Sequence, residues 1–157
     1  MALIHKILVA TDFSGPAVHA LDYGAELAVT YSAPLLILHV FTLPVVAVPD
    51  GYMTVTAPDA ASMTGKLHDG LHRAEARARS LGVAAVEYRL FEGAAWHEIV
   101  GMATAEGCDL IVMGTHGRSA VSHFLLGSVA EKVVRKASCP VLTVPPRSST
   151  DHHPRGA

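Results

Sequence analysis

The chain has 157 residues, half of them hydrophobic, and a formal net charge of -2 with neutral histidines. This length favours one domain with a sizeable core, which we expect over residues 1–146, followed by a disordered tail over 147–157. The scattered lysines and arginines exclude a basic nucleic-acid-binding stripe, and no apolar run approaches the ~18 residues that a membrane span requires. Because the first residues lack the order of a signal peptide, we expect a cytoplasmic protein without nucleic-acid or membrane partners.

The first predicted element is an apolar, β-branched strand over 4–10, buried on both faces. A turn over 11–16 follows, with Ser14 as a candidate N-cap and Pro16 near the first helical position. The next helix is expected to run to about Ser32. Its small-sided packing face repeats at helical spacing and comprises Ala17, Leu21, Gly24 and Ala28.

A second buried strand is predicted over 35–40. The segment 41–63 holds three prolines and one glycine without a usable period, and we interpret it as a flexible loop beside the site. A helix is then expected from about Thr64 to Leu81, stopped by Gly82. Its apolar stripe consists of Leu67, Leu71, Ala74, Ala78 and Leu81.

Alternating polarity over 86–90 predicts a strand with one partly wet face, as at a sheet edge. A third helix is expected over about 95–106, with Gly107 as its end. A strand over 110–113, a helix over 128–136 and a strand over 140–144 complete the pattern. This alternation predicts an α/β fold with a five-stranded, parallel, doubly wound sheet. The inward residues of the third helix are Trp96, Ile99, Val100 and Ala103.

A glycine-bearing loop lies between the fourth strand and the last helix. Gly114 and Gly117 follow the strand, and after nine residues Gly127 and Ser128 open the helix. Glycines let backbone N–H groups approach a ligand closely, and a helix N-terminus adds unpaired donors with a positive dipole end. The sequence therefore predicts a phosphate site held mostly by backbone. It is not a Walker loop, because no lysine precedes Ser128.

These segments together resemble the universal stress protein family, single-domain type, over about residues 4–144. The resemblance covers the first strand and turn, His39-Val40 at the end of the second strand, and the final Cys139-Pro140-Val141-Leu142-Thr143-Val144. It implies a Rossmann-like sheet of the adenine nucleotide alpha hydrolase-like type, with strand order 3-2-1-4-5. The spacing G-x2-G-x9-G-[ST] is that of the family members that bind ATP, so the resemblance implies an ATP-binding stress-response regulator.

The resemblance also implies a role for the residues of the loop. Backbone groups of Gly114, Gly117 and Gly127 would surround the phosphates, and Ser128 and Val129 would add N–H donors. The complete set of expected nucleotide-binding residues is Ala10, Thr11, Asp12, Val40, Met113, Gly114, His116, Gly117, Arg118, Gly127, Ser128 and Val129.

The side chains of that set have open alternatives. Asp12 is expected to take a ribose hydroxyl, the adenine amino group or a metal-bound water, or else simply to cap its turn. His116 and Arg118 are expected at the phosphates, although Arg118 could equally face solvent. Val40 would meet the adenine ring, and Ser128 could be only an N-cap.

The expected ligand is ATP, with or without Mg, and AMP or another adenine nucleotide is the alternative. No residue is nominated as catalytic, and we expect at most weak ATP hydrolysis. Family members commonly dimerise through the last strand, so a homodimer through Val141, Leu142 and Val144 is implied. The two other hypotheses are a slow ATP hydrolase using Asp12 and His116, and a nucleotide-independent adaptor.

Cysteine and histidine patterns give no further chemistry. Neither Cys108 nor Cys139 belongs to a C-x-x-C pair, so both are expected to be small buried or reduced thiols. His68 and His72 share a helical face, but no third ligand accompanies them, and we expect solvated side chains rather than a metal site. His39 is expected to be a structural histidine within its strand. His123 is expected to face solvent as a loop residue, and contact with a γ-phosphate is the alternative.

Overall fold

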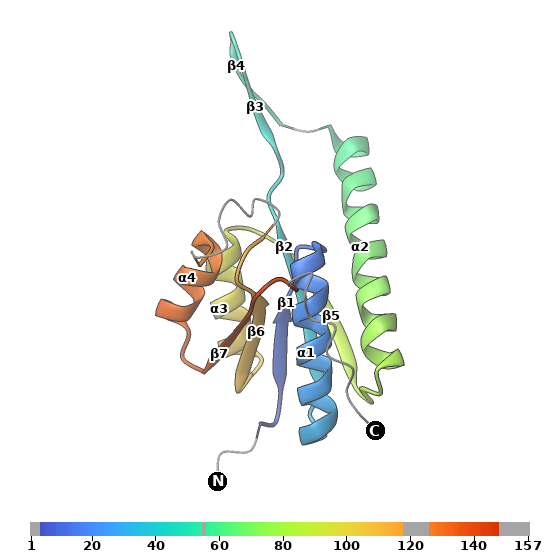
Figure 1. Ribbon diagram of the computed structural model, residues 1–157. Helices are drawn as coiled ribbons and strands as arrows, with labels where there is room; N and C mark the ends of the chain where they lie inside the picture. Colours follow the sequence, from blue (N-terminus) through green and yellow to red (C-terminus); the bar gives the residue numbers. More distant parts are fainter. Residues whose placement is uncertain (1–3, 55, 118–125, 148–157) are drawn as a thin grey trace.

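A five-stranded parallel sheet is the centre of the computed structural model, which describes residues 4–54, 56–117 and 126–147 (Figure 1). Its spatial order is β5-β2-β1-β6-β7, and every pairing in it is parallel. The strands are β1 (Ile7–Ala10), β2 (Leu35–Phe41), β5 (Val86–Glu92), β6 (Leu110–Gly114) and β7 (Val141–Val144). The α/β, doubly wound class is confirmed.

The strand numbering differs in detail from the expected 3-2-1-4-5. The chain forms two further strands, β3 (Val45–Val48) and β4 (Gly51–Thr54), between β2 and β5. Among the residues that the structure describes, these strands pair only with each other, in a separate antiparallel hairpin. Within the five-stranded sheet, the neighbours of each strand are those expected.

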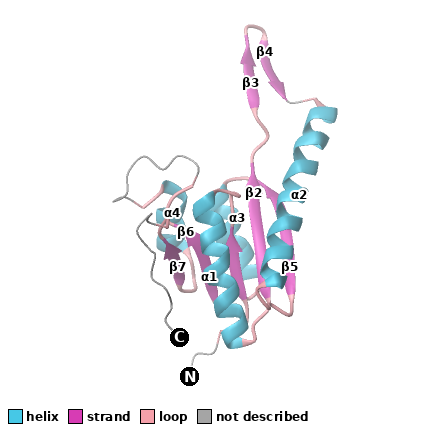
Figure 2. Cartoon of the chain, turned by 45° about the vertical axis from the view of Figure 1, so that its right-hand side comes forward, coloured by secondary structure: helices cyan, strands magenta, loops and turns pink. Residues whose placement is uncertain are grey.

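Two helices cover each face of the sheet (Figure 2). α1 (Gly15–Tyr31) and α2 (Ala57–Ser80) bury one face, whereas α3 (Ala95–Ala105) and α4 (Ser128–Lys136) bury the other. The side chains of β1 alternate between these two cores, with Ile7 and Val9 on the α1 side and Leu8 and Ala10 on the α3 side. Burial on both faces explains the continuous apolar runs of the central strands.

The start of α1 follows the sequence closely. Ser14 is the N-cap, and its hydroxyl accepts a hydrogen bond from the Ala17 N–H at 3.3 Å. Gly24 faces the sheet where α1 crosses β1, and an ideal Cβ there would lie only 2.4 Å from Val9 Cγ2. The predicted small face is confirmed, because Ala17, Leu21, Gly24 and Ala28 are all buried.

The apolar stripe of α2 is confirmed only in part. Leu71, Ala74 and Ala78 are buried and Leu67 is half-buried, but Leu81 is 42% exposed at the C-cap.

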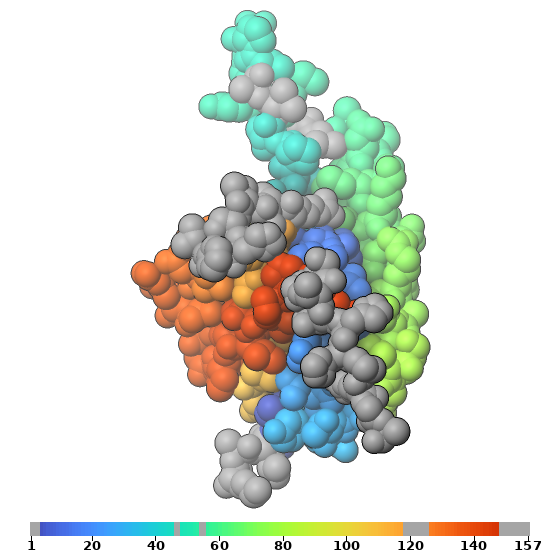
Figure 3. Space-filling model, in the orientation of Figure 1, coloured from blue at the N-terminus to red at the C-terminus, as the bar shows by residue number. Residues whose placement is uncertain are grey.

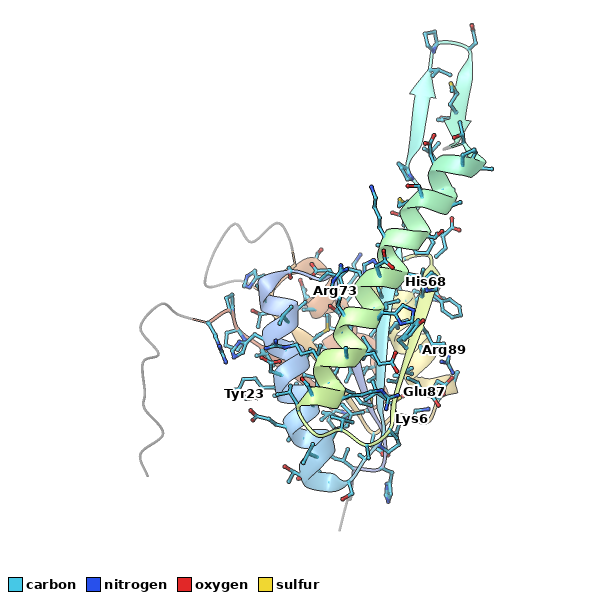
Figure 4. The ribbon with its side chains drawn as sticks, turned by 90° about the vertical axis from the view of Figure 1, so that its right-hand side faces the viewer. Lys6, Tyr23, His68, Arg73, Glu87 and Arg89 are labelled. Atoms are coloured by element: carbon cyan, nitrogen blue, oxygen red, sulfur yellow. The ribbon has the colours of Figure 1, made fainter. Side chains whose placement is uncertain are left out.

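β5 is the predicted edge strand, with only Val86 buried. In Figure 4 the side chains of Lys6, Glu87 and Arg89 gather near the lower end of the sheet. There Lys6 Nζ pairs with Glu106 Oε2 at 2.6 Å, which lowers the pKa of Glu106.

The interpretation of 41–63 as an irregular loop is wrong. Residues 45–54 form the β3–β4 hairpin, closed by a turn at Pro49 and Asp50. α2 begins at Ala57, seven residues before the expected Thr64, so its upper turns extend beyond the sheet toward the hairpin (Figure 4). Pro58 stands in the first turn of this helix, a position that tolerates proline because its N–H would have no helical partner.

The thiols are unreactive in character. Burial raises the pKa of Cys108 to about 11 and also raises the pKa of Cys139, so thiolate is scarce at neutral pH.

Within the described residues, no helix has the length and apolar character needed to cross a bilayer. The expected tail over 147–157 lies almost wholly outside the described residues.

Candidate functional site

The first wall of the candidate site is the turn that leaves β1. Thr11 Oγ1 accepts a hydrogen bond from the Phe13 N–H at 3.0 Å, and Asp12 Oδ1 accepts from both the N–H and the hydroxyl of Ser14, at 3.0 and 2.5 Å. Phe13 has φ of +64°, a left-handed conformation that is uncommon outside glycine. Asp12 therefore caps its own turn, as one of the open alternatives proposed.

Packing holds the strained turn in place. The Phe13 ring lies 4.5 Å, centroid to centroid, from the ring of His39 in β2, and its edge approaches Gly70 in α2. The buried His39 donates from Nδ1 to the Thr11 carbonyl at 2.7 Å, because a carbonyl can only accept. The expectation that His39 is a structural histidine is confirmed by this bond, which fixes the backbone next to Asp12.

The second wall is the glycine loop after β6. The Thr115 N–H donates to the Val144 carbonyl at 3.0 Å, and the Gly127 N–H donates to the Thr115 carbonyl at 2.7 Å. The second bond ties the two ends of the 114–127 excursion together where α4 begins. Gly127 is the N-cap of α4 and Ser128 is its first residue, so the reading of Ser128 as the N-cap is wrong by one position.

The glycines of this loop lie where a side chain would be crowded, most severely at Gly127. An ideal Cβ would lie 2.9 Å from the Thr115 carbonyl oxygen at Gly127 and 3.2 Å from the His116 carbonyl oxygen at Gly114. At Gly117 it would lie 2.9 Å from Asp12 Oδ2, so the loop and the β1 turn meet there. The backbone around Gly127 therefore requires a glycine, and the absent side chains of all three leave the backbone open to the cavity.

The two walls enclose a cavity of about 210 Å³ beyond the carboxyl ends of β1, β2 and β6. All of the predicted site residues except Arg118 line it. Arg118 lies outside the described residues, as does His123. The sequence reasoning missed Ala17, Leu38, Ala95, Ile99, Thr115 and Ala130, which also line the cavity.

The lining residues give the cavity two contrasting ends. Leu38, Val40, Ala95 and Ile99 come from β2 and α3 and supply apolar surface, whereas the 114–117 and 127–129 segments supply peptide groups. Among the described lining residues there is no lysine or arginine, and Asp12 is the only carboxylate. An anion in this cavity would therefore meet N–H donors and the N-terminal dipole of α4 rather than basic side chains.

His116 is the polar side chain with spare capacity at the glycine loop. Its Nδ1 lies 2.9 Å from Thr115 Oγ1, while its Nε2 is buried and has no hydrogen-bond partner among the described residues. Buried nitrogens without partners are uncommon and costly, so this atom suits a bound polar group. His68 and His72 on α2 differ from His116, because both are exposed and His72 Nε2 lies 3.1 Å from Tyr88 Oη.

Comparison with known proteins agrees with this geometry. The model of the universal stress protein family matches residues 4–145. Universal stress protein MJ0531 of Methanocaldococcus jannaschii is 32% identical over 143 residues, covering 90% of this chain and 82% of that protein.

Two solved structures show the same fold. The structure of MJ0577, also from Methanocaldococcus jannaschii, superposes with a TM-score of 0.77 at 26% identity, covering 94% of this chain and all of that one. A universal stress protein solved in complex with cAMP superposes with a TM-score of 0.70 at 27% identity, covering 93% and 100% of the two chains. The chain belongs to the universal stress protein family.

Proposed function

We propose that this protein binds an adenine nucleotide, ATP foremost, in the cavity between the β1 turn and the glycine loop. The observation that carries the proposal is the meeting of the Gly114–Gly117 and Gly127–Val129 segments at the cavity, where Gly127 leaves no room for a Cβ and Gly114 and Gly117 leave little. Such a backbone cradle at a helix N-terminus recognises phosphate by N–H donation and dipole. The fold supports the same place, because ligands of doubly wound sheets bind beyond the strand carboxyl ends.

The two ends of the cavity fit the two ends of a nucleotide. We assign the base to the apolar end formed by Val40, Leu38 and Ile99, and the phosphates to the peptide groups of Gly114, Gly117 and Gly127 with Ser128. His116 Nε2, buried without a described partner, would hydrogen-bond a phosphate oxygen. Asp12 has one oxygen engaged by Ser14, and its Oδ2 faces Gly117, within reach of a sugar hydroxyl or a metal-bound water.

A relative supports the class of ligand. The universal stress protein that this chain resembles at 27% identity was solved with cAMP, an adenine nucleotide. For this chain we favour ATP over AMP or cAMP, because two separate glycine segments supply more N–H donors than one phosphate uses. Mg would be bound mainly through the phosphates rather than by the protein.

Isothermal titration calorimetry tests the proposal directly. Nucleotide-free protein should bind ATP with measurable heat and should melt at a higher temperature in its presence, because a ligand of the folded state stabilises that state. Titration with AMP and cAMP ranks the alternatives, and repeating the ATP titration with EDTA measures the contribution of Mg. Absence of heat and of any thermal shift with all three nucleotides at millimolar concentration would reject an adenine-nucleotide site.

We propose that binding of the nucleotide, rather than its hydrolysis, carries the regulatory signal. Asp12 Oδ1 is already engaged in its turn, and the described lining residues include no lysine or arginine to stabilise the charge of a hydrolytic transition state. Chromatographic analysis of ATP incubated for hours with the protein should show little ADP. Rapid release of ADP that is lost in both Asp12→Ala and His116→Ala would instead establish a hydrolase.

The regulatory form that we propose is a homodimer through β7. This strand is the edge of the sheet, and its outer side has no strand partner among the described residues. Val144 is already buried in the protomer, so pairing would use the main chain of β7 together with the half-buried Val141 and Leu142. Sedimentation of Thr143→Pro, which removes a main-chain donor, should show less dimer than the wild-type chain.

A further inference from the structure

The β3–β4 hairpin, residues 45–54, stands away from the rest of the protein, and we call it the arm. In Figures 1 and 3 it is a narrow projection beyond the carboxyl end of β2, clear of the sheet and of its covering helices. β3 and β4 pair with each other from Val45↔Thr54 to Val48↔Gly51, and neither packs substantially against any other helix or strand of the described chain. The arm therefore lacks a core within its own protomer.

The arm exposes apolar side chains that the rest of the chain would normally bury. Val45 is 60% exposed, Tyr52 is 82% exposed and Met53 is 57% exposed. Tyr52 and Met53 are consecutive in a strand, so their side chains leave opposite faces of the hairpin. An isolated two-stranded hairpin is at best marginally stable in water, and three or more strands or a packed helix are needed to stabilise it.

The strands of the arm are short, four residues each, but their edges carry no charged side chain that would oppose pairing. Edge strands are commonly protected by lysine, by other charges or by a covering segment. From Phe41 to Thr56 the sequence contains a single charged residue, Asp50, and it lies in the turn at the tip. Across the described residues, β3 is the only strand paired with β4, so the outer edge of β4 is available.

We propose that the arm pairs with the arm of a second copy of this chain, β4 against β4, to form a four-stranded antiparallel ribbon. Antiparallel pairing about a twofold axis is self-complementary, since each copy supplies the same edge. Because the same short strand is met in the reverse direction, a charged residue in it would lie close to its own copy, and this uncharged strand has no such repulsion. A partner that recognised charge would find no counter-charge on β4.

This contact is separate from pairing through β7 and does not depend on the nucleotide. The arm continues from β2, next to the β5 edge, whereas β7 is the opposite edge of the sheet. A chain with both contacts has two distinct self-association surfaces. The arm contact accordingly predicts a tetramer or longer assembly when β7 is also paired, and a dimer when β7 is blocked.

Cysteine cross-linking of the full chain tests the arm contact. In Met53→Cys, a short bis-maleimide should yield at least about tenfold more covalent dimer than in Leu81→Cys, because a thiol held by pairing has an effective concentration near millimolar. Leu81 is also exposed, but it lies at the far end of α2 from the arm. Both variants retain Cys108 and Cys139, so the covalent dimer formed by the wild-type chain measures the cross-linking due to these two cysteines.

A second set of variants separates this contact from the proposed dimer. Met53→Cys combined with Thr143→Pro should cross-link as well as Met53→Cys alone, even if β7 pairing is lost. Tyr52→Lys with Met53→Lys should remove one association step in sedimentation and leave the ATP titration unchanged. Cross-linking no greater than that of Leu81→Cys would overturn the arm contact, whatever the result at β7 or with nucleotide.

Discussion

Glycines occur in two regions of this protein for different reasons. In α1 and α2, Gly24 and Gly70 make room for core side chains, since an ideal Cβ would lie 2.4 Å from Val9 Cγ2 and 2.9 Å from the Phe13 ring. At the cavity, Gly127 and Gly114 make room for backbone, since the nearest atoms are carbonyl oxygens of the same loop. The helix glycines therefore serve packing, and the loop glycines serve a shape that exposes peptide groups.

Obstruction by a side chain and obstruction by backbone have different consequences. A methyl group of Val9 can rotate or the helix can shift slightly, so a substitution at Gly24 should cost stability and leave the cavity intact. A carbonyl of Thr115 can move only if the loop changes conformation. Substitution at Gly127 should therefore alter the ligand site more than it alters the free energy of unfolding.

The largest expected effect is in Gly127→Ala. The new Cβ would displace the Thr115 carbonyl and weaken the 2.7 Å bond that joins the two ends of the loop. Loss of about one hydrogen bond to a charged phosphate corresponds to an ATP affinity roughly tenfold to a hundredfold weaker by calorimetry. Gly101→Ala in α3 is the matched control, because nothing lies within 4 Å of its Cβ position. Equal affinities for the two variants would contradict the backbone-cradle account.

A large loss of stability is expected in Gly24→Ala. Overpacking against Val9 should lower the free energy of unfolding by about 1–3 kcal/mol, even though alanine favours helix. Chemical denaturation measures the loss, and ATP affinity of the folded protein should stay unchanged. If Val9→Ala in the same chain failed to restore stability, the assigned cause would be wrong.

A smaller effect is expected in Gly70→Ala, which links the two regions. Its Cβ would press on the Phe13 ring, and Phe13 precedes the capping Ser14 and follows Asp12. We expect about 1 kcal/mol of destabilisation together with a few-fold weaker ATP binding. Phe13→Leu should relieve the overlap in the double variant. A pure stability loss with unchanged affinity would show that the turn tolerates movement of the ring.

The smallest effect, and of opposite sign, is expected in Gly65→Ala. This position is within α2 and has nothing within 4 Å of the Cβ site, so no packing opposes the substitution. Replacing a helical glycine by alanine should stabilise the protein by roughly 0.5–1 kcal/mol in thermal or urea unfolding. Destabilisation would indicate that the upper turns of α2 pack against another copy.

The sheet could be predicted because its strands are buried on both faces and read as apolar runs. The arm could not be recognised in the same way, since Pro49 and Gly51 within it, and Pro44 and Pro58 on either side, also suit an irregular segment. Asp50-Gly51 after the β-branched run Val45-Val46-Ala47-Val48 was the available hairpin signal. The early start of α2 had a signal too: Thr56 and Asp59 form a side-chain hydrogen bond, in the spacing of a capping box.

The glycine wall of the site could be predicted because its spacing carries the geometry. The apolar wall could not, since Ile99 and Ala95 belong to a helix whose periodicity shows only that one face is buried. Which part of that face turns toward the cavity depends on how α3 crosses β2. The spare Nε2 of His116 likewise depends on the packing around it and has no sequence signature.

The arm has no positively charged residue, and this lack of lysine and arginine extends well beyond it. No lysine or arginine occurs between Lys6 and Lys66, so trypsin has no cleavage site anywhere in β1, α1, β2 or the arm. A protease that cuts after aromatic residues would instead find Tyr52, which is 82% exposed on a segment without a core. In limited digestion, trypsin would therefore leave the arm uncut, whereas a protease that cuts after aromatic residues would cleave the folded protein at Tyr52 in β4.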